Sequence, residues 1–255
     1  MKGVILNEKE ILNKALNKEE ITDNIKTFSI LRILAKYYFS KNYDKKEIIN
    51  LLNDYMKLTE EDYSEDKLLG RIKGLVTSVG KYNNFNLVDI EQVIITENEW
   101  NKIIELDNKQ LEKLAFILLV YQKINEIKNP DSDGWINQNI TDIFRESSLR
   151  AYGEDQKLML HTLYKKGYIK LKLICDSNGI KLTYNNSNSD SKIIINNFVN
   201  VISYYYEYRN NEKWKECSEC GKRFKIKSNT KIPKYCIKCA RKVNNKKTLY
   251  NYYNK

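Results

Sequence analysis

The chain has 255 residues, enough for two or three small domains, and carries 44 Lys and Arg against 33 Asp and Glu, a formal net charge of +11. Its longest apolar run, LAFILLV at 114–120, is far shorter than the ~20 residues of a membrane-spanning helix. The opening MKGVILNEKE has neither the apolar core nor the cleavage site of a secretion signal, so we expect a cytoplasmic protein without a membrane partner.

Residues 1–90 are predicted to form a helical domain, because apolar residues recur there at helical spacing. Asp44 followed three residues later by Glu47 is a capping-box pattern, which predicts that a helix begins after Asp44. A further helix is expected over 65–81. Two glycines four residues apart in it suggest the close approach of another backbone, since glycine weakens a helix by roughly 1 kcal/mol.

Residues 91–109 are interpreted as a connector between domains. A short strand over 93–96 is predicted to run into a helix opened by Thr96 or Asn98. A second connecting segment is expected over 192–211, where isoleucine, phenylalanine, valine and tyrosine recur at helical spacing and predict a connecting helix.

Between these segments, residues 110–184 are predicted to contain three helices followed by a β-hairpin. The expected elements are an apolar helix over 110–128, a helix capped by Asn139, a helix over 154–166 ended by Gly167, and strands over 168–175 and 180–184.

The order helix, helix, turn, helix, strand, turn, strand resembles the winged helix–turn–helix family, and LHTLYKKGYIKLKL resembles the end of its recognition helix and its first wing strand. The resemblance implies that the third helix lies in the DNA major groove. The candidate nucleic-acid contacts there are Arg150, Tyr152, Gln156 and Lys157. Glu154 and Asp155 depart from this expectation, because they repel phosphate. A protein-binding role for this domain therefore stays open.

Residues 212–255 contain two C-x2-C pairs, Cys217 with Cys220 and Cys236 with Cys239, separated by fifteen residues. This spacing is typical of a zinc site, and Gly221 follows the first pair where such a turn often needs a positive φ. Four thiolates close the tetrahedron around one Zn²⁺, so we expect a structural ion. The alternatives are two disulfides or four unrelated thiols.

The net charge is concentrated around these cysteines. Residues 213–255 hold 14 Lys and Arg against two Glu, a net charge of +12, whereas residues 1–212 have a net charge of −1. A basic block on a zinc module indicates a nucleic-acid partner, although a solubilising tail is the alternative. The candidate contacts in this module are Lys222, Arg223, Lys225, Lys227, Lys234, Arg241 and Lys242.

Enzyme chemistry finds little support in the sequence. There is no G-x-x-x-x-G-K-[ST] phosphate loop, and no H-x-E accompanies the C-x2-C pairs as in a zinc deaminase. We therefore expect no catalytic residues.

The segments CSECGKRFKIKSNTKIPKYCIKCARK and SILRILAKYYFSKNYDKKEIINLLNDYMK resemble proteins of phages and mobile elements of low-GC Gram-positive bacteria that pair a winged helix with a zinc end. The resemblance implies a DNA-binding regulatory or replication-associated protein in the host cytoplasm, with DNA preferred to RNA. The alternative is an effector that binds a host nucleic-acid machine such as RNA polymerase, a replication protein or a defence nuclease. The helical N-terminal domain would contact a host or phage protein, or a second copy.

The expected fold is mainly α. It comprises a helical N-terminal domain (1–90), a connector (91–109), a central winged helix–turn–helix (110–184), a connecting helix (192–211) and a small zinc-ribbon-like module with a basic tail (212–255).

Overall fold

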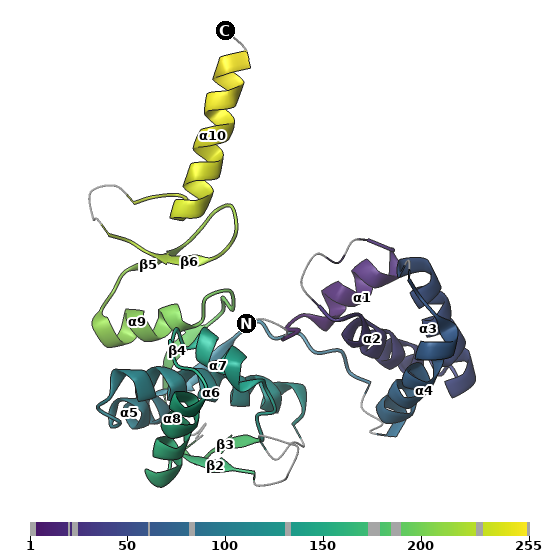
Figure 1. The fold of residues 1–255 in the computed structure, drawn as a ribbon, viewed down its shortest axis with the longest axis horizontal. Helices are drawn as coiled ribbons and strands as arrows, with labels where there is room; N and C mark the ends of the chain where they lie inside the picture. The colour runs from purple at the N-terminus through teal and green to yellow at the C-terminus, as the bar shows by residue number, and fades with distance from the viewer. Residues whose placement is uncertain are drawn as a thin grey trace. The chain divides into compact units, whose positions relative to one another are not determined.

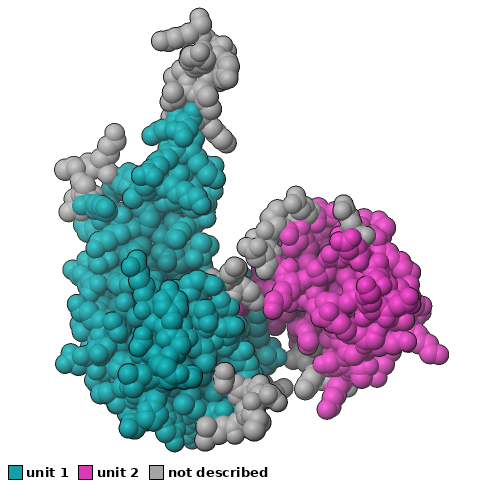
Figure 2. Space-filling model, in the orientation of Figure 1, with its two compact units in different colours: residues 1, 91–255 teal, residues 2–90 magenta. Residues whose placement is uncertain are grey.

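The structure, a computed structural model, describes residues 4–19, 21, 25–60, 62–81, 85–130, 134–172, 179–184, 190–227 and 232–253, and the last eight of these by their backbone alone. The chain divides into two compact units (Figure 2). In chain order, the first unit is residues 2–90, drawn in magenta, and the second unit is residues 91–255, drawn in teal. The described part is mainly helical, as the sequence predicts (Figure 1). None of its helices is both long enough and apolar enough to cross a membrane.

The first unit, residues 2–90, is a bundle of four helices. They are α1 (Glu8–Leu16), α2 (Thr27–Ser40), α3 (Lys45–Thr59) and α4 (Glu65–Lys81). Helix α2 packs against the other three, and its Leu31, Ile33 and Leu34 are almost fully buried. The predicted capping box at the start of α3 is confirmed, since Asp44 accepts hydrogen bonds from Lys46 N and Glu47 N while Glu47 accepts one from Asp44 N.

The expected close approach of another backbone to the α4 glycines is wrong. Gly70 and Gly74 are exposed, and a Cβ placed on either would meet nothing within 4 Å. The opposite face of α4 enters the core instead, through Ile72, Val76 and Val79. The two glycines lie on the solvent side, where alanine would fit.

The body of the second unit surrounds one buried helix, α6 (Lys109–Lys128). The run from Leu114 to Tyr121 is buried on every side, as its continuous apolar sequence predicts. The elements around it are β1 (Val93–Thr96), α5 (Glu97–Ile104), α7 (Ile140–Glu146), α8 (Glu154–Lys165), β2 (Ile169–Leu171), β3 (Ile180–Leu182), β4 (Ser191–Ile195) and α9 (Ile202–Asn210).

The expected helix over 192–211 is wrong in its first part. Residues 191–195 form β4, which pairs antiparallel with β1 in the register Val93 with Ile195, and the helix begins only at Ile202. Ile193 and Ile195 are buried while Ile194 between them is exposed, which is the period of two of a strand. The β-branched isoleucines favour a strand, and β1 provides a strand with which they can pair. These two effects outweigh the helical spacing of the apolar residues.

The same pairing corrects the interpretation of residues 91–109 as a connector. The strand and helix predicted there both exist, and Thr96 caps α5 in a capping box with Glu99. However, Ile95, Trp100 and Ile103 are buried, so the segment is part of the core of the second unit.

The three helices and the hairpin predicted over 110–184 are present in the expected order. Asn139 caps α7, and Gly167 follows α8 with a φ of +77°. Strands β2 and β3 pair antiparallel, and Ile136, between α6 and α7, forms an isolated antiparallel bridge with Ile180 of β3. Both strands are shorter than predicted, and residues 173–178, with most of the expected hairpin turn, lie outside the described residues.

The C-terminal part of the second unit is small, and we call residues 212–253 the metal module. It consists of β5 (Trp214–Glu216), β6 (Arg223–Lys225) and α10 (Ile237–Tyr253). Strands β5 and β6 form an antiparallel hairpin, and Figure 1 shows α10 continuing away from it.

Candidate metal centre

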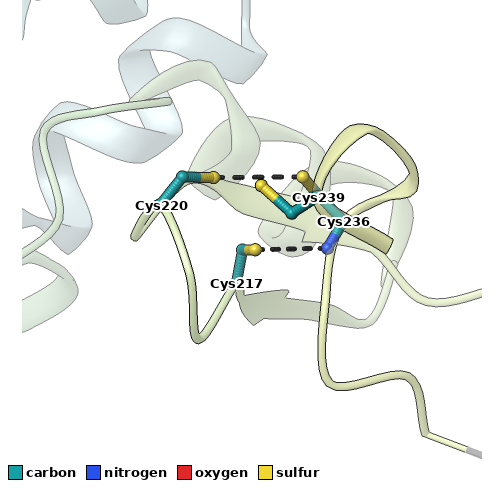
Figure 3. A group of neighbouring side chains, drawn as sticks. All are labelled: Cys217, Cys220, Cys236 and Cys239. Atoms are coloured by element: carbon teal, nitrogen blue, oxygen red, sulfur yellow. Dashed lines mark hydrogen bonds between the residues drawn. The ribbon is translucent and has the colours of Figure 1, made fainter. Parts of the chain in front are cut away.

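The structure brings the four cysteines together. The sulfurs of Cys217, Cys220, Cys236 and Cys239 all lie within 4.8 Å of one another. The first two lie in the turn between β5 and β6, the third lies just before α10, and the fourth is in the first turn of α10 (Figure 3). This arrangement excludes four unrelated thiols.

We call the turn of each C-x2-C pair a knuckle. The first knuckle, with Cys217 and Cys220, is held by backbone hydrogen bonds within the hairpin. Cys217 N donates to Lys222 O at 3.1 Å, and Gly221 N donates to Cys217 O at 2.9 Å. Gly221 has a φ of +66°, which is the left-handed conformation expected from its place after the pair. The turn therefore directs both of its sulfurs to one point.

The second knuckle is tied to the first. Cys236 N donates to the Cys217 sulfur at 3.3 Å, and the hydroxyl of Ser218 donates to Lys234 O at 3.2 Å. Phe224 and Tyr235 are partly buried against the cysteines and shield them. Cys217, Cys236 and Cys239 are consequently buried, whereas Cys220 is exposed.

The thiols of the cluster differ in acidity. Burial opposes ionisation of Cys217, but backbone N–H groups of Cys236, Glu219 and Cys220 point at its sulfur and lower its pKa to about 6. The neighbouring sulfur of Cys220, together with burial, raises the pKa of Cys239 to about 12. Cys217 thus ionises at a lower pH than Cys239.

The donor set fits a single soft or borderline cation. All four cysteines are free thiols, and the sulfurs of Cys220 and Cys236 are 3.9 Å apart, far beyond the ~2.05 Å of a disulfide. Four sulfur ligands in a closed cluster suit tetrahedral coordination and leave no position for substrate or water. The cluster can hold one metal ion, whose role would be structural.

Most of the basic residues predicted around the cysteines are exposed. Lys222, Lys227, Lys234, Arg241 and Lys242 all face solvent. Lys225 is also exposed, but its ammonium pairs with Glu212 at 2.9 Å. Two further exposed lysines, Lys213 just before β5 and Lys215 on it, were not among the predicted contacts, although the net charge of the segment includes them.

Arg223, unlike the other predicted contacts of this module, is buried. Its side chain is only 8% exposed, because the guanidinium lies over the ring of Tyr204 and pairs with Glu207 of α9 at 2.5 Å. No sequence signal distinguishes this arginine from its exposed neighbours. The face of β6 that it occupies is covered by α9, whose position depends on tertiary packing.

The predicted contacts on and before α8 differ in whether their side chains are free to face solvent or are paired within the chain. Arg150 and Tyr152 are exposed, and the Tyr152 side chain is the most exposed of the large apolar residues at 74%. Gln156 Nε2 donates to Ala151 O at 2.8 Å, so this amide group is engaged within the chain. Lys157 pairs with Glu154 at 2.7 Å on the helix surface.

The exposed face of α8 is more apolar than a groove-reading helix requires. Leu158 is 64% exposed and Tyr164 is 50% exposed, whereas Leu160 and Leu163 enter the core. His161 is exposed beside Tyr164, and their rings stack at 6.4 Å. The spacing of these apolar residues in the sequence predicts a helix, but it does not show which of them the core buries.

Comparisons of the chain with protein-family models, with curated proteins and with solved structures found no match.

Proposed function

We propose that the protein is a non-enzymatic nucleic-acid-binding protein in which one structural Zn²⁺ organises a basic module. The observation that carries the proposal is the convergence of four cysteines at the base of α10, a helix without a single acidic residue. The exposed basic residues of the module surround this cluster on the hairpin and on the start of α10. Zinc is preferred among soft cations because four thiolates in a closed tetrahedral cluster are typical of its structural sites.

Helix α10 supports a duplex partner. It has 17 residues, so it is about 25 Å long. Its basic residues are Lys238, the adjacent pair Arg241 and Lys242, and the adjacent pair Lys246 and Lys247. The major groove of B-DNA admits an α-helix, whereas that of A-form RNA is too deep and narrow for side chains to read. DNA is accordingly the proposed polymer.

The helices and hairpin over 109–182 support a second, orienting contact. Their order resembles that of a winged helix–turn–helix, and the exposed Arg150 and Tyr152 lie at the turn before α8. Glu154 and Asp155 at the start of α8 limit how closely that helix can approach phosphate. In this proposal the metal module supplies most of the affinity and the helical domain supplies the orientation.

A regulatory or replication-associated role in a phage or mobile element, in the cytoplasm of its host, follows from the resemblance of the two sequence segments. The four-helix unit of residues 2–90 is assigned to a protein partner or a second copy.

The proposal is tested by fluorescence anisotropy of the zinc-loaded protein with labelled duplex DNA, single-stranded DNA and duplex RNA across a salt series. We expect duplex DNA to bind best. With about six phosphate contacts, its affinity should fall on the order of 10³-fold between 50 and 200 mM salt. Weak binding that is equal for all three polymers would refute the proposal.

A second candidate function, an effector directed at a host protein, is favoured by the exposed apolar face of α8. Leu158 and Tyr164 on α8, and Tyr152 just before it, are each at least half exposed. Exposed apolar patches mark interaction sites, and tyrosine is enriched in protein interfaces. A pull-down from host lysate with and without nuclease separates the two functions. A partner that survives nuclease and is lost with Leu158→Glu would support the effector.

A further inference from the structure

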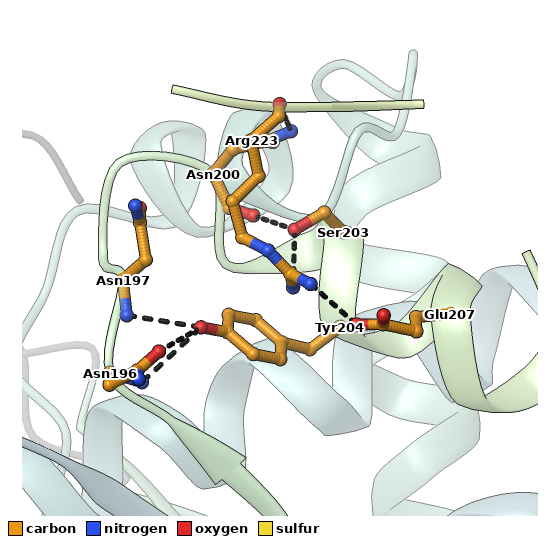
Figure 4. A network of polar contacts seen from close by, with 7 residues as sticks. All are labelled: Asn196, Asn197, Asn200, Ser203, Tyr204, Glu207 and Arg223. Carbon is orange, nitrogen blue, oxygen red and sulfur yellow. Dashed lines mark hydrogen bonds and ion pairs between the residues drawn. The ribbon is translucent and has the colours of Figure 1, made fainter. Parts of the chain in front are cut away.

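Arg223 joins the metal module to the body of the second unit. Its Nη2 donates to Glu207 Oε2 at 2.5 Å, its Nη1 donates to Ser203 Oγ at 3.1 Å, and its Cζ lies 3.8 Å from the centroid of the Tyr204 ring (Figure 4). We call these contacts the Arg223 junction. Because the guanidinium is almost completely buried, its charge depends on Glu207 for compensation.

The loop before α9 also holds the knuckle of the metal site directly. Asn197 Nδ2 donates to Gly221 O at 2.8 Å, and Asn200 Nδ2 donates to Arg223 O at 3.0 Å. Gly221 follows Cys220 immediately in the chain. These two hydrogen bonds can form only when the hairpin that carries Cys220 has its folded shape.

Helix α9 is itself fixed to the body on another side. Tyr205 and Arg209 both donate to the buried carboxylate of Glu112 on α6, at 2.7 and 2.8 Å. On its other face, α9 carries the residues that form the Arg223 junction, which are Ser203, Tyr204 and Glu207. Helix α9 therefore connects a rigid core on one face to the metal module on the other.

We infer that metal binding at the four cysteines and the Arg223 junction are thermodynamically coupled. A ligand cluster of this kind does not persist in an unfolded segment, so metal binding folds the hairpin that presents Arg223. By linkage, the junction must raise the affinity for the metal by the same factor by which the metal strengthens the junction. The inference rests on the proposed metal site and does not depend on nucleic-acid binding.

The test uses substitutions on α9, which leave the metal module itself unchanged. The apparent zinc affinity of the full chain is measured by competition with a chromophoric chelator. We expect Glu207→Gln to lower it about tenfold, which is a typical coupling between two sites, and Ser203→Ala to lower it about threefold. The matched control is Glu212→Gln, which removes a carboxylate that pairs with Lys225 within the module. It should change the affinity less than twofold.

A double-mutant cycle then assigns the effect to the junction. Arg223→Gln should lower zinc affinity as much as Glu207→Gln, and the double variant should be no weaker than either single variant, because both remove one shared interaction. Equal zinc affinity in the wild type and Glu207→Gln would overturn the coupling. If Glu207→Gln does not fold, Ser203→Ala takes its place, and equal zinc affinity in the wild type and Ser203→Ala would overturn the coupling. A wild-type protein that binds no zinc would instead overturn the metal site, a distinguishable result.

Discussion

Arg209 on α9 donates a hydrogen bond from its Nε to the fully buried carboxylate of Glu112 on α6, at 2.8 Å. Tyr205, one turn earlier on α9, donates its hydroxyl to the same carboxylate at 2.7 Å. Burial and this hydrogen bond raise the pKa of Tyr205, so the hydroxyl keeps its proton and remains a donor. One buried acid thus holds the helix that carries the Arg223 junction.

We expect Glu112→Gln to destabilise the second unit. The substitution leaves the guanidinium of Arg209 without its counter-charge, which costs several kcal/mol for fully buried pairs. Because Arg209 is 30% exposed and water can solvate it, the expected loss is about 2 kcal/mol. Urea unfolding followed by tryptophan fluorescence measures it, since Trp100 packs beside Tyr205.

The control for this substitution is Glu105→Gln, which breaks an exposed pair with Lys102. It should leave the urea midpoint almost unchanged. Equal midpoints for Glu112→Gln and Glu105→Gln would show that the buried pair contributes nothing.

Removal of the metal is expected to unfold the metal module alone. The cysteine cluster has few apolar neighbours apart from Phe224 and Tyr235, so the module has little core without an ion. Chelation or Cys220→Ser should lower the helical circular dichroism signal only in proportion to α10 and should weaken DNA binding. Limited proteolysis would then cut after residue 212 and leave residues 91–211 protected.

Unchanged DNA binding by Cys220→Ser would remove the metal module from the proposed mechanism. A collapse of the whole chain would show that the body depends on the module, contrary to the separate core around α6.

The apparent metal affinity should rise with pH. Metal binding requires thiolates, so every proton still on a sulfur must be released. Cys239, with its pKa raised to about 12, keeps its proton at neutral pH, and below pH 6 Cys217 also becomes protonated. The slope of log affinity against pH should therefore become steeper below about pH 6. Chelator competition between pH 5.5 and 8 measures this slope, and a flat profile would contradict it.

The basic face of the metal module should determine the salt dependence of DNA binding. Arg241 and Lys242 are exposed at the start of α10, so replacing both with glutamine should reduce the slope of log affinity against log salt by about 2. Arg223→Gln should not reduce the slope, because its side chain is buried against Tyr204. A slope reduced by about 1 in Arg223→Gln would restore that residue as a phosphate contact.

Local signals of the sequence predicted several elements well. Caps at Asp44, Thr96 and Asn139 depend on side chains within three residues of the helix start, and all three are confirmed. The convergence of the cysteines was also predictable, because the spacing of each pair contains most of the geometry of a knuckle.

The errors concern interactions between distant segments. Residues 191–195 became a strand because residues 93–96 offered a partner, and Arg223 was buried because α9 covers one face of β6. Neither partner is adjacent in sequence, and no composition or periodicity reveals it. Tertiary packing likewise decides which face of α8 is covered, since Leu160 and Leu163 are buried and Leu158 is exposed.

The position of Cys239 inside the first turn of α10 has a consequence for the whole helix. Starting a helix is unfavourable because several residues must be ordered before the first hydrogen bond compensates, whereas adding residues to an existing turn is nearly neutral. Ala240 N already donates to Cys236 O at 2.8 Å. A metal held by Cys236 and Cys239 would fix this turn and act as a nucleation template. The basic residues that follow in α10 repel one another and oppose helix formation. With the first turn fixed, this segment would extend from it as a helix.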